Sequence, residues 1–348
     1  MTAEPKQPIR GLLREELAER LKEMGEPAFR AEQIRHWLYR RPAETWEEMR
    51  NVPNALREKL ERAFDLSSIE IVQTRTSDSG ARKLLCRLRD GEFVEEVLIP
   101  APNRRTVCLS SQVGCAFDCA FCASGKTGKI RNLSAGEIVD QAVAAQRLYG
   151  ERLTNVVFMG VGEPFDNYDE VLRAIRLLND PDGFGLGARR ITISTCGVVP
   201  GIKRLEKEGL QVELSVSLHA PTDAIRDRIM PVNRKWPLDE LMAACQAYVR
   251  KTRRIVTFEY VLIRDVNDSD DACRRLVERL RRFPCRANLI PYGEIAEYAG
   301  RPAPRERFER FARELERAGI NVTVRRSKGG DVDAACGQLR SRHARKNA

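Results

Sequence analysis

Three cysteines with a fixed spacing constrain this chain more than any other feature. Cys115, Cys119 and Cys122 stand in the run Gly-Cys-Ala-Phe-Asp-Cys-Ala-Phe-Cys, with three and then two residues between them. Three thiolates on one short loop can hold three irons of a 4Fe–4S cluster and leave the fourth iron without a protein ligand. An iron with an open position can bind a small molecule, which a cluster with four cysteine ligands cannot do. The spacing therefore predicts a cluster that binds a ligand.

Two simpler interpretations of the same cysteines are weaker. Zinc prefers four ligands, usually from two pairs of residues, and the loop itself contains no fourth Cys or His. Cysteines that only pack in the core would not require this spacing.

Composition suggests a large globular enzyme with an anionic partner. The 348 residues, 42% of them hydrophobic, suit one barrel-sized domain and a smaller one. Ten cysteines and no recognisable signal peptide predict a reducing cytoplasm, and no apolar run approaches the ~20 residues of a membrane helix. The net charge of +10 favours a polyanion such as nucleic acid, although an arginine-rich solvated surface would give the same charge.

Hydrophobic periodicity divides the first hundred residues into two parts. Apolar residues recur at helical spacing through residues 1–68, with many basic residues between the apolar stripes. Residues 69–100 change to β-strand chemistry, with turns expected at Ser79-Gly80 and Asp90-Gly91. We therefore expect a small helical N-terminal domain followed by a β-hairpin extension.

Residues 101–330 repeat a strand followed by a helix. Apolar strands are expected at residues 106–109, 155–159, 191–195, 212–217, 256–263, 287–290 and 321–324. Such alternation predicts an α/β fold with a parallel sheet, and about six units bent round one site form a partial (β/α)6 TIM-like barrel. Active sites in such barrels lie at the carboxyl ends of the strands, where the cysteine loop and the later motifs fall. Residues 331–348 form a separate C-terminal segment.

Longer strings resemble a known enzyme family. They are Thr-Val-Cys-Leu-Ser-Ser-Gln-Val-Gly-Cys at 106–115, Arg-Asn-Leu-Ser-Ala-Gly-Glu-Ile-Val at 131–139, Val-Phe-Met-Gly-Val-Gly-Glu-Pro at 157–164, Ser-Val-Ser-Leu-His-Ala-Pro at 215–221 and Asp-Ala-Ala-Cys-Gly-Gln-Leu at 333–339. The cysteine spacing is the hallmark of radical S-adenosylmethionine (SAM) enzymes, and the set resembles the RlmN/Cfr family of radical SAM RNA methyltransferases. The resemblance covers nearly the whole chain, including the N-terminal domain.

The resemblance implies cofactors, a substrate and partners. The cofactors are one 4Fe–4S cluster on the three cysteines and SAM, with two SAM molecules used per turnover. The family's substrate is an adenosine in the peptidyl-transferase region of 23S rRNA. RlmN members methylate carbon 2, some also modify the adenosine 3′ of the tRNA anticodon, and Cfr members methylate carbon 8; this sequence is more similar to RlmN. We further expect RNA binding by the N-terminal domain, a flavodoxin-type reductant, no membrane partner and a monomer.

The resemblance also implies catalytic roles for three residues. Carbon 2 of adenine is electron-poor and cannot accept a methyl group directly. Cys336 matches the cysteine that is methylated first and then, after a radical removes hydrogen from its S-methyl group, becomes crosslinked to the base. Cys108 matches the cysteine that attacks the Cys336 sulfur, forming a transient disulfide and releasing the product. Glu95 matches the proposed proton acceptor, and strand alternation puts Glu96 on the opposite face.

The positions that match SAM contacts end the second, third and fourth strands of the expected barrel. They are Gly162, Glu163, Ser194, Ser217, Leu218 and His219. One position departs from the family, because Gly293 stands where an asparagine usually contacts SAM. The remaining cysteines match no catalytic position and are interpreted as core or incidental: Cys86, Cys196, Cys245, Cys273 and Cys285. A non-catalytic iron–sulfur factor for ribosome assembly is the alternative from another class, but it would need neither Cys108 nor Cys336.

Overall fold

One ten-stranded sheet organises the chain. The computed structural model describes residues 6–325, so Cys336 and the C-terminal segment lie outside the described residues. The strand order is β14-β13-β12-β11-β10-β9-β6-β5-β4-β3, and the seven strands from β6 to β14 are parallel. These seven are β6 (Arg104–Cys108), β9 (Asn155–Phe158), β10 (Ile191–Thr195), β11 (Glu213–Ser217), β12 (Val256–Leu262), β13 (Cys285–Pro291) and β14 (Asn321–Val324). The expected parallel α/β fold is confirmed.

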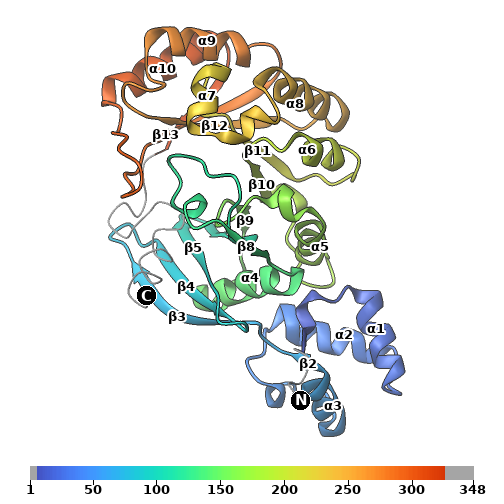
Figure 1. Ribbon diagram of the computed structural model, residues 1–348. Helices are drawn as coiled ribbons and strands as arrows, with labels where there is room; N and C mark the ends of the chain where they lie inside the picture. The colour runs from blue at the N-terminus through green and yellow to red at the C-terminus, as the bar shows by residue number, and fades with distance from the viewer. Residues whose placement is uncertain (1–5, 326–348) are drawn as a thin grey trace.

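Helices connect successive parallel strands and cover one face of the sheet (Figure 1). They are α4 (Ala135–Tyr149), α5 (Tyr168–Asn179), α6 (Val199–Leu205), α7 (Asp223–Ile229), α8 (Leu238–Thr252), α9 (Asp270–Leu280) and α10 (Arg305–Arg317). Six strand–helix units followed by a last strand form the partial barrel. It is open because, among the described strands, β3 and β14 lie at opposite edges of the sheet.

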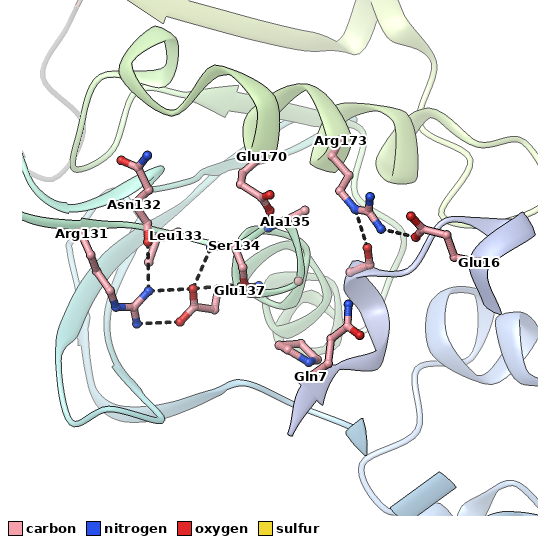
Figure 2. Close-up of a pocket in the computed structure, with 13 residues that line it drawn as sticks. Gln7, Glu16, Arg131, Asn132, Leu133, Ser134, Ala135, Glu137, Glu170 and Arg173 are labelled. Carbon is pink, nitrogen blue, oxygen red and sulfur yellow. Dashed lines mark hydrogen bonds and ion pairs between the residues drawn. The ribbon is translucent and has the colours of Figure 1, made fainter. Parts of the chain in front are cut away.

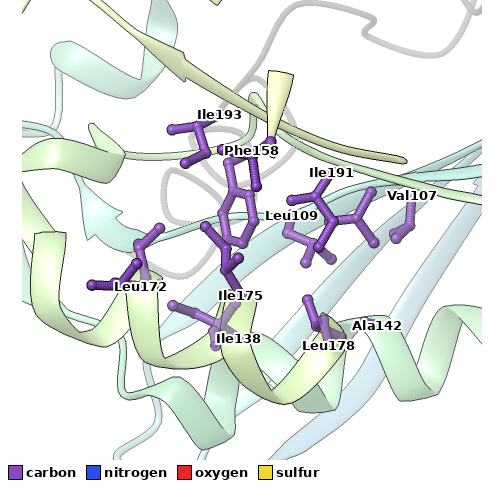
Figure 3. Close-up of a cluster of buried hydrophobic side chains, with 14 of the residues drawn as sticks. Val107, Leu109, Ile138, Ala142, Phe158, Leu172, Ile175, Leu178, Ile191 and Ile193 are labelled. Atoms are coloured by element: carbon purple, nitrogen blue, oxygen red, sulfur yellow. The ribbon is translucent and has the colours of Figure 1, made fainter. Parts of the chain in front are cut away.

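The two faces of the parallel sheet differ in chemistry. The face toward the helices is apolar: Phe158 pairs in register with Ile193, and Figure 3 shows these side chains packed with α4 and α5. Residues opposite each other on neighbouring strands share a face. Register therefore places a series of polar side chains on the other face, called here the inner face: Thr192, Ser194, Ser215, Ser217, Glu259 and Asn288. Ordinary TIM barrels fill this space with branched apolar side chains, so the inner face is built for binding.

The β extension continues the same sheet. Strands β3 (Ile69–Thr76), β4 (Arg82–Leu88) and β5 (Phe93–Ala101) run antiparallel, and β5 pairs with β6 through Val97 and Cys108. The predicted boundary near residue 100 therefore separates an antiparallel part from a parallel part of one sheet. As a result, the inner face extends from the barrel onto the extension.

The N-terminal domain is helical, as expected, and is attached by buried polar contacts. It contains α1 (Arg14–Glu23), α2 (Phe29–Arg35), which continues as a π-helical turn through Arg40, and α3 (Asn54–Ala63), with short strands β1 (Gln7–Pro8) and β2 (Phe64–Asp65). Arg10 is buried and donates to Asp140 of α4 at 2.8 Å, and Asp140 also accepts from the Ser68 amide at 2.7 Å. Among residues 6–325, no helix is both long and apolar enough to span a membrane.

Candidate active site

The cysteine loop follows the first parallel strand and is closed at its base by two glycines. It connects β7 (Gln112–Gly114) to β8 (Lys129–Asn132), which pair antiparallel. The Cys115 amide donates to the Gly128 carbonyl at 3.0 Å. Gly114 has φ 79°, and a Cβ at this position would collide with the Gly128 carbonyl oxygen. Only glycine therefore allows the two ends of the loop to approach this closely.

Inside the loop, the three cysteines are partly buried and near one another. Burial raises the pKa of the Cys115 thiol to about 12, and burial, followed by the charges of Cys122 and Cys115, raises the pKa of Cys119 well above its ordinary value. Thiolate ligands in such surroundings need a metal centre to supply the compensating positive charge.

The donor set fits an iron–sulfur cluster. Three soft thiolates on one loop suit this group better than a hard cation, which prefers oxygen ligands. Within residues 6–325, no three His, Cys, Asp or Glu side chains form a ready-made metal site. The fit therefore depends on the chemistry and spacing of Cys115, Cys119 and Cys122.

The Gly162-Glu163 turn braces two strand ends. Gly162 has φ 102°, and a Cβ there would lie 2.6 Å from the Gln112 side chain. The buried Glu163 carboxylate accepts from the amides of Phe165 at 3.0 Å and Cys196 at 2.7 Å. Burial raises the pKa of Glu163, although these two amides oppose the shift. In this structure the Glu163 side chain joins the end of β9 to the end of β10, and its contact with SAM stays a prediction.

The ends of β10 and β11 bring the other predicted SAM positions together. Ser194 and Ser217 both lie on the inner face, and Leu218 is fully buried directly after β11. His219 has φ 53° and its Nδ1 accepts from the Val261 amide at 2.9 Å. Burial lowers the pKa of His219 to about 3, and the charge of Arg226 adds to this effect. The imidazole is therefore neutral near pH 7.

A ring contact links His219 to the cysteine loop. The Phe121 ring, next to Cys122, meets the His219 ring edge to face with centroids 4.8 Å apart. The structure thus brings the cysteine loop and the predicted SAM positions to one end of the barrel, as strand topology predicts.

The predicted base and the predicted resolving cysteine share the inner face. Val97 is opposite Cys108 in register, and Glu95 lies on the same side of β5 as Val97. The Glu95 carboxylate forms an ion pair with Lys83 Nζ at 2.9 Å, and both side chains are buried. Sequence analysis did not identify Lys83, although a lysine within an apolar strand could have indicated a buried partner for a carboxylate. Glu96 points to the other face and is fully buried, so the predicted alternation is confirmed.

Three further polar residues on the inner face were also missed. Glu259 Oε1 accepts from Asn288 Nδ2 at 3.0 Å and from Ser215 Oγ at 3.3 Å. Burial raises the pKa of the Glu259 carboxyl. Each of these residues stands in the middle of an apolar strand, where only the register of neighbouring strands reveals the common cluster.

The other predictions have mixed outcomes. Cys86, Cys245 and Cys273 are buried, as expected of core cysteines, whereas Cys196 and Cys285 are partly buried. Gly293 lies exposed after β13 and supplies no side chain in place of the family's asparagine. Cys336 lies outside the described residues.

A cavity of about 590 Å³ lies elsewhere, between the N-terminal domain and the start of α4 (Figure 2). None of the predicted site residues lines it. Its two arginines are paired with glutamates, since Arg173 contacts Glu16 and Arg131 donates to Glu137 at 2.8 Å. We interpret it as part of the domain junction.

An open parallel barrel with a three-cysteine loop at the carboxyl ends of its strands defines a radical SAM enzyme. Residues 109–277 match the model of the Radical SAM superfamily, and residues 8–66 match the ribosomal RNA large subunit methyltransferase N-terminal domain. A crystal structure of a radical SAM methyltransferase from Sphaerobacter thermophilus is 47% identical, has a TM-score of 0.93 and covers 96% of this chain and 99% of its own.

Curated relatives narrow the class to one family. The protein from Symbiobacterium thermophilum is 48% identical, with 98% of this chain and 93% of its own length covered. The protein from Geobacillus kaustophilus is 43% identical, with 98% and 94% covered. Both are named "Probable dual-specificity RNA methyltransferase RlmN". This chain belongs to the RlmN family.

Proposed function

We propose that this protein methylates carbon 2 of an adenosine in the peptidyl-transferase region of 23S rRNA and, as a second substrate, the adenosine 3′ of the tRNA anticodon. The observation that carries the proposal is the common inner face of Glu95 and Cys108, which continues to the predicted SAM positions. Similarity along the full chain to proteins named dual-specificity RNA methyltransferases supports the choice of substrates.

Two groups of residues would hold the cofactors. Cys115, Cys119 and Cys122 would ligate a 4Fe–4S cluster, and the residues at the ends of β9, β10 and β11 would orient SAM. When bound, cluster and SAM together supply a radical that removes hydrogen from a methyl group. We propose that a flavodoxin-type protein donates the electron and that the enzyme works as a monomer in the cytoplasm.

The remaining steps use the chain's own side chains. The Cys336 thiolate accepts a methyl group from SAM and later carries the crosslink between its carbon and adenine carbon 2. Glu95 accepts the proton lost from carbon 2. The Cys108 thiolate then attacks the Cys336 sulfur, and the bond from that sulfur to the bridging carbon breaks with its electron pair left on the carbon, which takes up a proton and becomes the new methyl group. The two cysteines become a disulfide. The adduct would also give up, to the bound cluster, the one unpaired electron left by the radical addition. Lys83 holds the Glu95 carboxylate toward the inner face.

Nucleoside mass spectrometry tests the proposal. The 23S rRNA and tRNA of a deletion strain are digested and compared with those of the same strain carrying the wild-type gene. We expect 2-methyladenosine to be absent from both RNAs of the deletion strain and restored by the gene. Gene-dependent 8-methyladenosine in place of the 2-methyl isomer would indicate a carbon 8 enzyme. No gene-dependent methylated adenosine would contradict the proposal.

A further inference from the structure

A fully buried arginine lies beside the cysteine loop. Arg226 belongs to α7 and has 0% of its surface exposed. The chain contains many arginines, but most are on the surface, where water stabilises the guanidinium. Moving a cation into the interior is energetically unfavourable unless nearby groups compensate its charge. A buried arginine at an active site therefore needs an explanation.

Neutral groups accept the hydrogen bonds of Arg226. Its Nε donates to the Leu218 carbonyl at 3.1 Å, and its Nη2 donates to the carbonyls of Cys196 at 2.6 Å and Ser217 at 3.0 Å. Its Nη1 donates to Asn233 Oδ1 at 3.1 Å. These bonds fix the guanidinium at the ends of β10 and β11, but no acceptor in this set carries a full negative charge.

The nearest carboxylates are reached only indirectly. Asn233 Nδ2 donates to Asp223 at 2.9 Å and to Asp227 at 2.7 Å, and both aspartates are partly exposed. Within residues 6–325, Arg226 forms no direct ion pair with a carboxylate. Its positive charge is therefore only partly compensated by the described residues.

The cysteine loop is in direct contact with the segment that carries Arg226. The Ala120 amide, next to Cys119, donates to the Ile229 carbonyl at the end of α7 at 2.9 Å. Cys119 and Cys196 also pack against the same small apolar cluster beneath the loop. Arg226 Nη2 donates to the backbone carbonyl of Cys196, whose side chain packs on that cluster beside Cys119. The guanidinium therefore lies against the same dry, apolar packing as the loop, where charges are poorly screened.

We propose that Arg226 is a positioning residue that raises the reduction potential of the iron–sulfur cluster held by the cysteine loop. This inference rests on the proposed cluster. Reduction transfers one electron from a low-potential donor, such as a flavodoxin-type protein, to the cluster without forming or breaking a bond. The cluster and its three thiolates become more negative by one charge, so a nearby fixed cation stabilises the reduced form. Net charge and buried surroundings are among the main controls of such potentials.

Redox titration of the reconstituted full-length enzyme, monitored by electron paramagnetic resonance without RNA, tests the inference. Arg226→Gln removes the charge and should lower the midpoint potential by about 59 mV or more, a tenfold change in the one-electron equilibrium. Arg226→Lys keeps the charge and should recover most of the loss. Arg228→Gln is the matched control, because Arg228 is exposed on the same helix, and its potential should equal that of the wild type.

A second variant covers the case in which Arg226→Gln does not fold. Asp223→Asn keeps an oxygen that can accept from Asn233 but removes one of the carboxylates nearest to Arg226, so it should raise the potential by leaving the cation less compensated. A wild-type potential in a folded Arg226→Gln protein, or in Asp223→Asn, would show that Arg226 only braces the loops. A wild-type protein that binds no 4Fe–4S cluster would instead refute the proposed function itself.

Discussion

Two adjacent glutamates show how strongly one residue of register determines chemistry. Glu95 lies on the inner face with Lys83, whereas Glu96 lies on the apolar face, opposite Leu84. Neither carboxyl oxygen of Glu96 accepts a hydrogen bond from the described residues. Burial accordingly raises the pKa of Glu96 well above the ordinary 4.5. Sequence similarity distinguishes the two residues by role, and the sheet distinguishes them by environment.

Glu96 should make stability depend on pH. The pKa of the Glu96 carboxyl is higher in the folded protein than in the unfolded chain, so its contribution to the free energy of unfolding is fully present below pH 4.5. This contribution is lost as the pH rises from there through the folded pKa, by up to about 1.4 kcal/mol per pH unit. Glu96→Gln removes this dependence. Urea unfolding at pH 5, 6 and 7 should therefore show the variant gaining stability relative to the wild type as the pH rises. If the difference in free energy of unfolding between Glu96→Gln and the wild type stayed the same at all three pH values, Glu96 would not be a buried, protonated carboxyl.

Cys108 and Cys336 should give separable phenotypes. Cys336→Ala cannot accept the methyl group, so it should form neither S-methylcysteine nor an RNA adduct. Cys108→Ala should accumulate RNA attached through Cys336, because no other group carries out the thiolate attack that releases it. Denaturing gels with and without nuclease would measure this. A crosslinked band for Cys336→Ala, or none for Cys108→Ala during turnover, would reject the assigned roles.

At the scale of elements, strongly periodic segments were predictable and short ones were not. The long helices α4 and α5 show several turns of apolar periodicity, and α4 starts at the capping box of Ser134 and Glu137. In contrast, α6 and α7 have seven residues each, too few to show a repeated pattern, and sequence analysis did not identify them. The omission matters, because α7 carries Arg226.

The cysteine loop should not retain an iron–sulfur cluster when the two ends of the loop cannot approach each other. Gly114→Ala introduces a methyl group that collides with the Gly128 carbonyl, so the variant should lose most of its iron and its brown absorbance after anaerobic reconstitution. Gly128→Asn is the control, because Gly128 has φ 66°, which asparagine tolerates, and open space around its Cα. Iron and sulfide analysis would compare the two. Full iron content in Gly114→Ala would contradict the proposed closure.

At the scale of the whole molecule, the N-terminal domain is an integral part of the fold. Arg10 joins it to the barrel through Asp140 and also donates to the carbonyls of Leu38 and Ala43 within the domain itself. Deleting residues 1–65 would take Arg10 away from Asp140 and uncover the barrel surface that the domain buries. RNA binding by this domain is therefore better tested with surface substitutions than with a truncation.

Breaking the domain junction should be costly. Asp140→Ala leaves the buried Arg10 without its carboxylate and should lower the free energy of unfolding by about 3–5 kcal/mol. The exposed pair between Arg14 and Asp182 is the matched control, and Asp182→Ala should cost less than about 1 kcal/mol. Chemical denaturation would measure both. Equal losses for the two variants would show that the junction does not depend on the buried pair.

RNA should contact exposed arginines of the N-terminal domain. Arg41 and Arg50 are exposed and form no ion pair within residues 6–325, whereas Arg10 and Arg35 are buried. Replacing both exposed residues with glutamate should weaken RNA binding and make it less sensitive to salt, since each phosphate contact releases counterions. Binding measured from 50 to 200 mM salt would test this, with unchanged uncoupled SAM cleavage as the control for folding. An unaltered salt dependence would place the RNA elsewhere.

The sequence by itself determined the type of the long elements, their order, the parallel sheet and the family, because periodicity and motif spacing are local properties. It also placed the predicted SAM positions at the strand ends, since consecutive βα units present those ends on one side. Only the tertiary structure decided which charges are buried together. Arg10 and Asp140, for example, are 130 residues apart in the chain. The pairing of Lys83 with Glu95 depends on the register of the sheet, and the burial of Arg226 depends on how the loops pack. The energy of a charge depends on its surroundings in three dimensions, which no local pattern of residues encodes.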